Sequence, residues 1–405
     1  MLFTSFTFLL FHLAVVALRW LLPGRAAPSL LLVASLAFYL SWEPLYGLLL
    51  GGATAVAWVA GLLIERGPAR RGRIVVVSIA TLLAGLAWFK YAGLVRTGLV
   101  ALLGAVGSGA RVPELSIVLP LAISFFTFEL VSYVVDVSRG EPAERSFARL
   151  LLWASYYPHL IAGPIVRAHE LLPALRDEVR FDADQISEGV GIALAGLAKK
   201  VILADNLAVL ADQVFAAPGK HSTFGVWLGV LAYTGQIYCD FSGYTDIARG
   251  ASLTLGYRLP DNFDLPYLSR SPAEFWRRWH MTLSRWLRDY LYVSLGGNRG
   301  GRVATYRNLL LTMLLGGLWH GASLTFVAWG GLHGLALAVH RAWSERVQRS
   351  TVGALLAGSR AYAAAGWLLT MLVVVAGWVL FRAPTFGVAA ELFGRMVQAS
   401  PGLGE

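Results

Sequence analysis

Two histidines lie near the two ends of the segment from Ser271 to Gly321. His280 follows arginines and tryptophans, and His320 ends an apolar run that closes with LWHG. A neutral imidazole can take a proton from a hydroxyl group near neutral pH, which is the task of a general base. Each histidine also has a structural interpretation, as one residue of a surface helix or as a core residue bonded to a backbone carbonyl. Position alone leaves both interpretations open.

Further ionisable groups occur in apolar segments. Glu129 and Asp136 are seven positions apart, so they share a helix face, and there they either pair with arginine or line a pathway. Asp240 and Asp246, with Ser242 and Tyr244 between them, follow an apolar run. These carboxylates suggest either a cation site or ion pairs with an arginine-rich helix, but they lack the spacing of an EF-hand loop.

The residue types do not favour a metal centre. The single cysteine, Cys239, excludes an intrachain disulfide and a cysteine-rich metal site, and a lone cysteine in an apolar segment is typical of a small buried hydrophobe. His333 and His340 are seven positions apart and share a helix face. No H-E-x-x-H motif or carboxylate-rich spacing supplies a further ligand, so we predict no metal.

A helix is expected to position His280. At about 100° per residue, Phe275 to Tyr292 forms one amphipathic helix that lies in a membrane interface. Pro272 and Glu274 suit its first turn, and Ser271 is a candidate cap. One side then carries Trp279, Leu283, Trp286, Leu287 and Tyr290, an adjacent arc carries Arg277, Arg278, Arg285 and Arg288, and His280 lies between the two sets.

The composition is that of a polytopic membrane protein. The 405 residues are 57% hydrophobic and only 14% charged, with a mean hydropathy of +0.60, too little polar surface for a soluble protein of this size. The formal charge of +10 comes mainly from arginine, and positive charge in short loops is expected beside anionic membrane lipids. We therefore do not expect nucleic-acid binding.

Apolar runs of the length that spans a bilayer, about 20 residues, organise the chain. With the shorter pieces near 94–106, 146–166, 190–215 and 307–319, they predict roughly nine to eleven crossings in one membrane domain, 1–405. We expect the first run to be a spanning helix rather than a removed signal peptide, and basic loops at Arg25 and at Glu65 to Arg73 predict an amino terminus outside. The eight longer runs are 3–22, 27–42, 44–64, 74–91, 115–136, 224–248, 322–341 and 361–383.

Helix-breaking residues interrupt several of these runs. Broken backbone at membrane depth is tolerated only where it is buried in protein or lines a wet cavity. The interruptions therefore predict a cavity or tunnel rather than a compact bundle. They are Pro120, Pro158, Pro164, Gly316, Gly317 and Gly321.

Six motifs occur in a fixed order along the chain. They are FKYAGL (Phe89 to Leu94), PLAISFFTFELVSYVVDVSRG (Pro120 to Gly140), AGPIVR (Ala162 to Arg167), YCDFSGYTDIARG (Tyr238 to Gly250), the block Leu259 to Arg299 with its RRWH, and LLGGLWHGASLTFVAWGGLHG (Leu314 to Gly334). Together they resemble the membrane-bound O-acyltransferases, above all the bacterial branch that modifies alginate and teichoic acids. The likeness runs from about Phe89 to Arg382.

The resemblance implies an all-α ring of tilted helices around a funnel or tunnel, in a bacterial cytoplasmic membrane. It implies that His320 of the WHG motif is catalytic and that His280 orients the donor or stabilises the oxyanion. The donor would be acetyl-CoA or an acyl-carrier phosphopantetheine thioester, with no bound cofactor. Arg277, Arg278, Arg285 or Arg288 would hold donor phosphates, and the tunnel lining would include Trp319, Asp240, Ser242, Tyr244, Asn262, Trp279, Glu129 and His159.

The expected acceptor is a hydroxyl of an exported polysaccharide or of an extracytoplasmic, esterase-like partner protein. The chain departs from the family pattern at Glu129 and His159, where an uncharged amide is expected, and we hypothesise that the two residues pair. It also ends at Glu405, where alginate-type relatives continue, which bears on how the acceptor docks. The alternatives are D-alanyl transfer from a carrier protein, a transporter or channel, and a scaffold for polysaccharide export. A transporter often has two similar halves, which this sequence lacks.

Overall fold

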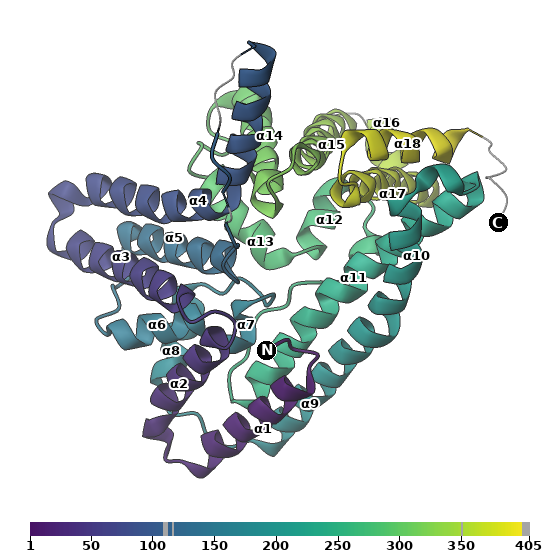
Figure 1. Cartoon of the computed structure of the whole chain (residues 1–405). Coiled ribbons are helices and arrows are strands. Elements are labelled where there is room, and N and C mark those ends of the chain that lie inside the picture. The colour runs from purple at the N-terminus through teal and green to yellow at the C-terminus, as the bar shows by residue number, and fades with distance from the viewer. Residues whose placement is uncertain (108–111, 116, 350, 399–405) are drawn as a thin grey trace. The chain divides into compact units, whose positions relative to one another are not determined.

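The computed structural model describes residues 1–107, 112–115, 117–349 and 351–398, and its regular structure there is helical, as the sequence predicts (Figure 1). The chain divides into two compact units. Unit 1 comprises Met1–Leu197 and Tyr244–Pro260, and unit 2 comprises Ala198–Gly243 and Asp261–Glu405. The single membrane domain stays a prediction.

Each of the eight predicted apolar runs overlaps a helix. Unit 1 contains α1 (Phe6–Leu21), α2 (Ala27–Leu40), α3 (Tyr46–Arg66), α4 (Arg71–Ala105), α5 (Ile123–Arg139), α6 (Phe147–Ser155), α7 (Tyr157–Leu160), α8 (Ala168–Arg176) and nearly all of α9 (Ala183–Ala198). Unit 2 contains α10 (Asp205–Ala216), α12 (Pro272–Arg278), α13 (Met281–Trp286), α14 (Gly301–His320), α15 (Leu324–Gln348), α16 (Thr351–Ala357), α17 (Arg360–Arg382) and α18 (Phe386–Val397). The long helix α11 (Thr223–Thr254) contributes to both units.

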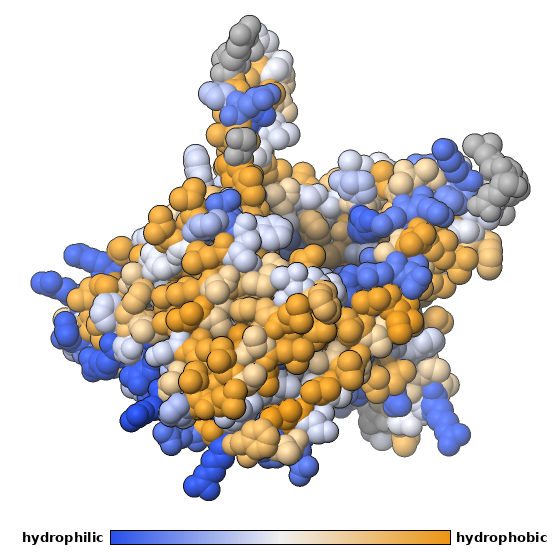
Figure 2. Space-filling view, turned by 60° about the horizontal axis from the view of Figure 1, so that its bottom comes forward, coloured by the Kyte–Doolittle hydropathy of each residue, from blue (hydrophilic) through white to orange (hydrophobic). Residues whose placement is uncertain are grey.

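Several helices are suited to a bilayer. Among the described residues, Tyr46–Arg66, Pro68–Ala105 and Arg360–Arg382 are long and apolar enough to span one, and Phe6–Leu21 and Gly24–Leu40 are shorter apolar helices. Large apolar side chains are exposed over much of the face in Figure 2, which is costly in water but not against lipid. The expected nine to eleven crossings and the outside amino terminus stay predictions.

Pro120 and Pro164 lie between helices, as predicted, and Pro158 lies in the first turn of α7, but two of the glycines do not interrupt a helix. Helix α5 begins at Ile123, after Pro120. Helix α14, by contrast, runs unbroken through Gly316 and Gly317 to His320, so the predicted break there is wrong and the helix stops only before Gly321.

Close packing explains why glycine stands inside α14. A Cβ atom at Gly317 would overlap the backbone oxygen of Phe326 on α15, and a Cβ at Gly330 on α15 would overlap the backbone oxygen of Met313 on α14. Small residues allow two helix backbones to approach this closely. Gly317 and Gly330 therefore pack α14 against α15.

The single interfacial helix predicted for Phe275 to Tyr292 is also wrong. Ser271 and Pro272 start α12 as expected, since the Ser271 hydroxyl accepts a hydrogen bond from the Glu274 N–H at 3.1 Å. The helix then ends at Arg278, and α13 begins after His280. The tryptophans predicted to anchor in the interface, Trp279 and Trp286, are buried within the protein, 4% and 6% exposed. His280 consequently lies at a break in the helix.

A π-helical turn, Leu287–Tyr292, and a glycine turn lead from this break to α14. Gly296 and Gly297 have φ angles of 103° and 56°, in the left-handed region that glycine adopts most readily. The Asn308 side chain on α14 donates hydrogen bonds to the carbonyls of Leu295 and Gly297, both at 3.0 Å. These hydrogen bonds hold the glycine turn against α14, the helix that ends at His320.

Candidate active site

His280 occupies a strained position in unit 2. Its φ of 43° is in the left-handed region, where a non-glycine residue persists only if its surroundings hold it. The loop before α12 provides this restraint. The Met281 N–H donates to the Asn262 carbonyl at 2.9 Å, and the Asp264 N–H donates to the Arg278 carbonyl at 3.0 Å. Tertiary hydrogen bonds thus fix the break at His280.

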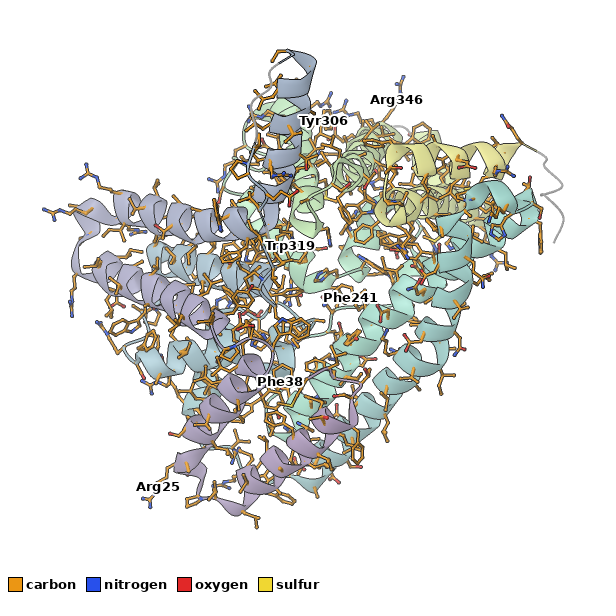
Figure 3. The ribbon with its side chains drawn as sticks, in the orientation of Figure 1. Arg25, Phe38, Phe241, Tyr306, Trp319 and Arg346 are labelled. Carbon is orange, nitrogen blue, oxygen red and sulfur yellow. The ribbon has the colours of Figure 1, made fainter. Side chains whose placement is uncertain are left out.

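The His280 side chain is buried, with a relative exposure of 1%. Its Nδ1 lies 3.1 Å from Asn262 Oδ1. The ring of Phe241 on α11 meets it edge-on at a centroid distance of 4.6 Å, and Trp319 on α14 lies at 6.5 Å (both labelled in Figure 3). Burial, and to a lesser extent repulsion from His320, hold the pKa of His280 well below its usual range. Burial therefore favours the neutral form of this imidazole.

His320 is the last residue of α14 and is half-buried. Three aromatic rings meet its imidazole edge-on, with centroid distances of 4.9 Å to Trp319, 5.1 Å to Trp329 and 5.2 Å to Phe381. These rings come from α14, α15 and α17, so three helices pack against the side chain. Because Trp319 also contacts His280, the structure brings the two histidines to one aromatic site within unit 2.

The other predicted site residues fall into separate groups. Trp279 packs on Trp378 and Phe263, at centroid distances of 4.8 and 5.0 Å, in the core of unit 2. Asp240 and Ser242 lie inside α11, and Asp240 forms an ion pair with Lys200 at 2.8 Å. Tyr244 lies on the part of α11 that belongs to unit 1. Their predicted role in lining a tunnel stays a prediction.

Sequence reasoning missed several residues that contact the predicted site residues. Lys200 belongs to a π-helical turn, Lys199–Ala204, and also pairs with Asp205 at 2.6 Å. A π-turn is frequent at functional sites, but no sequence pattern marks this one. Trp329 and Phe381 were not singled out either, since each lies in an apolar run where aromatic residues are ordinary. No group of three or more potential metal ligands was found in the described parts of the chain.

The four arginines predicted to hold donor phosphates differ in their surroundings. Arg277 and Arg288 are exposed, and Arg278 and Arg285 are partly buried. Arg278 pairs with Glu274 at 3.0 Å, and Arg288 pairs with Asp289. Arg288 also lines a cavity of about 260 Å³, together with Arg341, Trp276, Leu287, Met313 and Leu337. Of these four arginines, Arg288 is therefore the one that lines this cavity.

The expected pairing of Glu129 and His159 is present in unit 1. His159 Nδ1 lies 3.2 Å from Glu129 Oε1, and both side chains are 1% exposed. His159 Nε2 lies 3.1 Å from the Trp153 carbonyl, which can only accept, so Nε2 carries a hydrogen. A hydrogen bond at the Glu129 contact then needs a second proton, on Nδ1 or on the carboxyl group.

We expect Glu129→Gln and His159→Gln each to lower the free energy of unfolding by about 1–3 kcal/mol, because each leaves a buried polar partner poorly satisfied. The double variant should recover part of this loss, which a double-mutant cycle in thermal unfolding measures. His169→Gln is the matched control, since His169 is 39% exposed and lies 3.4 Å from Asp136 on the same helix as Glu129. Additive losses would contradict the coupling. If the variants kept the wild-type rate of acyl transfer at every pH, a role of this pair in catalysis would be ruled out.

Comparison with protein families identifies the class of protein that carries this site. The family model of the membrane-bound O-acyltransferases matches residues 115–375, so the chain belongs to this family. It is a multi-pass membrane protein and an acyltransferase of the O-acetyltransferase type.

Individual relatives are similar over most of the chain. The probable alginate O-acetylase AlgI of Pseudomonas aeruginosa is 42% identical over 401 residues, covering 98% of this chain and 75% of the relative. The peptidoglycan O-acetyltransferase of Helicobacter pylori is 36% identical over 398 residues, covering 91% and 73%. The teichoic acid D-alanyltransferase of Bacillus subtilis is 28% identical over 235 residues, covering 54% and 58%.

Proposed function

We propose that this protein moves an acetyl group from a cytoplasmic thioester, across the membrane, to a hydroxyl of an exported polysaccharide or of an extracytoplasmic partner protein. The observation that carries the proposal is the aromatic site of His280 and His320, in a chain that is 42% identical to a probable alginate O-acetylase over nearly its whole length. The acceptor polymer is then alginate, peptidoglycan or a chemically similar glycan.

In the proposed reaction His320 is the general base. One of its ring nitrogens takes the proton of the acceptor hydroxyl while the oxygen attacks the thioester carbonyl carbon. The tetrahedral intermediate collapses, the carbon–sulfur bond breaks, and the thiolate takes the proton back from the imidazolium. The products are an O-acetyl ester and a free thiol. The aromatic rings of Trp319, Trp329 and Phe381 keep bulk water from hydrolysing the thioester.

The donor is proposed to be acetyl-CoA or an acyl-carrier phosphopantetheine thioester. Both carry phosphate, and arginine is the side chain best suited to bind it. The cavity beside Arg288 and Arg341 has cations among apolar residues such as Trp276 and Leu337, which suits a phosphate group joined to a less polar arm. We propose that this cavity holds the phosphate end of the donor.

Arg288→Gln and Arg341→Gln are expected to raise the KM for acetyl-CoA about five- to tenfold, with little change in kcat, because each loses a contact made equally in the ground and transition states. Initial rates over a range of donor concentrations measure this. Arg277→Gln is the matched control, since Arg277 is exposed and does not line the cavity. An equal rise in KM for all three variants would instead indicate general surface attraction.

Two other functions make different predictions. A D-alanyltransferase would use a charged carrier protein in place of acetyl-CoA, as the similarity to a teichoic acid D-alanyltransferase suggests. A transporter or an export scaffold would need no imidazole chemistry and would keep its function in a His320→Ala variant. The three aromatic rings that pack on His320 favour chemistry over an open pore.

Complementation tests the proposed function in a cell. The gene is expressed in an alginate-producing bacterium that lacks its own alginate O-acetylase, and the acetyl content of the secreted polymer is measured by NMR. Restored acetylation is the expected result. If the protein reaches the membrane but acetylates neither alginate nor, in a matching strain, peptidoglycan, the proposed acceptor class is wrong.

A further inference from the structure

The carboxamide of Asn262 is the centre of a hydrogen-bond network around His280. Asn262 lies in the loop before α12 and is 1% exposed. Its Oδ1 atom lies 3.1 Å from His280 Nδ1, 3.1 Å from the Thr282 backbone nitrogen and 3.0 Å from Thr282 Oγ1. Three polar groups thus converge on one atom of a buried side chain.

The network determines which way the amide points. Asparagine oxygen and nitrogen are distinguished by their hydrogen-bond partners. A backbone N–H can only donate, so the Asn262 atom that faces the Thr282 nitrogen must be the oxygen. The opposite orientation would bring two donors together in a buried site.

The same argument determines the tautomer of His280. Because Asn262 Oδ1 can only accept, the His280 Nδ1 atom beside it must carry the hydrogen. In the neutral ring Nε2 then has the lone pair. A neutral His280 in this tautomer can accept a proton or a hydrogen bond at Nε2, but it cannot donate one there to an oxyanion.

The second polar atom of Asn262 is in a different situation. Its Nδ2 carries two N–H donors, is buried, and has no hydrogen-bond partner among the described residues. A buried donor without a hydrogen-bond partner costs about 1–3 kcal/mol. Such unpaired donors are common in sites that are organised to bind a group of the substrate.

We propose that Asn262 has two roles: its Oδ1 holds His280 in the tautomer with hydrogen on Nδ1, and its Nδ2 donates a hydrogen bond to the carbonyl oxygen of the acyl donor. The inference rests on the proposed acyl transfer. It moves oxyanion stabilisation from His280 to Asn262. As the carbonyl oxygen gains negative charge during attack, the hydrogen bond from Nδ2 strengthens and lowers the barrier.

Other ionisable groups bear on the test. His320 on α14 acts on the titration of His280. The elements that pack against His280 also carry Asp240, which pairs with Lys200 and precedes Phe241 on α11, and Asp264 in the loop, which lies 3.9 Å from Arg278. The substitutions below leave all of them in place. A change in the titration of His280 can therefore be assigned to residue 262.

Kinetics test the donor role. Asn262→Asp keeps an oxygen facing Thr282 but removes the N–H donors, so we expect kcat to fall about 10²–10³-fold, as for loss of one oxyanion-hole donor. The new carboxylate also raises the pKa of His280. Because only the neutral imidazole has a lone pair on Nε2, the acid limb of the pH profile should move to higher pH. Thr370→Val is the matched control: it removes a buried hydroxyl of unit 2 that donates to the Gly366 carbonyl at 2.7 Å, outside the Asn262 network, and should keep kcat within about threefold.

Nitrogen NMR tests the tautomer without any activity. In protein labelled with ¹⁵N-histidine and placed in lipid bilayers, the His280 signals are assigned by their loss in His280→Gln. We expect hydrogen on Nδ1 in the wild type and in Thr370→Val, and a shift toward hydrogen on Nε2 in Asn262→Ala.

Hydrogen on Nε2 in the wild type would overturn the tautomer assignment, and a near-normal kcat in Asn262→Asp would overturn the donor role. A fall in kcat that merely follows a fall in thermal stability across all the variants would reduce Asn262 to a structural residue. If the wild type transfers no acyl group, the proposed function fails, while the NMR result still decides the tautomer.

Discussion

Replacing His320 with alanine is expected to lower the rate of acyl transfer by about 10²–10⁴-fold, because a positioned general base contributes a factor of that size. The rate is measured with purified protein in lipid vesicles, as the acetyl groups transferred from a thioester donor to an acceptor hydroxyl. The amount of protein inserted should be unchanged, since His320 is half-buried and packs on rings that remain in place.

His340→Ala is the matched control for this variant. His340 is a second histidine of unit 2, half-buried on α15, where it contacts Ser344 at 3.3 Å. We expect it to transfer at close to the normal rate. If both variants lost the same share of the transfer rate, the loss would follow from removing any imidazole from α14 or α15 and would not be specific to His320. A normal rate in His320→Ala alone would remove His320 from the mechanism.

Gly330→Ala should lower both the stability of the protein and its rate of acyl transfer. The added methyl group would overlap the Met313 backbone oxygen on α14, and a backbone cannot swing aside as a side chain can. Overpacking of this kind costs typically about 1–3 kcal/mol. Because α15 also carries Trp329, which contacts His320, transfer should fall with stability. Thermal unfolding in detergent and the transfer rate measure the two losses.

The adjacent glycine supplies the control. A Cβ at Gly331 would lie 3.5 Å from the Leu314 side chain, an ordinary contact, on the same helix. Alanine favours a helix over glycine by about 1 kcal/mol, so Gly331→Ala should be neutral or slightly stabilising. If the two variants unfold at the same temperature, the contact between the backbones of α14 and α15 does not limit packing as described.

Sequence patterns predicted helices well and helix ends less well. Long apolar runs form helices here because their length and composition permit little else in a bilayer. The break at His280 was missed because its left-handed backbone depends on Asn262, which is distant in sequence. The break predicted at Gly316 and Gly317 was wrong. Glycine has a low helix propensity, but the close packing of α14 against α15 requires glycine at Gly317 and keeps the helix intact.

The candidate site shows the same division. His280 and His320 could be selected from motifs, and the pairing of Glu129 with His159 from two ionisable residues in apolar segments. The aromatic packing of Trp329 and Phe381 on His320 could not be predicted, because it depends on how α14, α15 and α17 pack. The orientation of the Asn262 amide follows only from the contact with the Thr282 N–H. The residue types were enough to predict the kind of reaction, but the contacts between the site residues could be described only from the fold.

The most direct measurement follows a labelled acetyl group. The wild-type protein and His320→Ala are reconstituted in vesicles with acetyl-CoA labelled in the acetyl carbon, and oligosaccharide acceptors, with and without an extracytoplasmic partner protein, are analysed for O-acetyl ester. We predict that the wild type places the label on an acceptor oxygen and that His320→Ala lowers the rate of this labelling by at least about 10²-fold. Equal labelling by the two proteins would contradict the central role of His320. Labelling by neither, with an acyl-carrier thioester failing as well, would contradict acyl transfer itself.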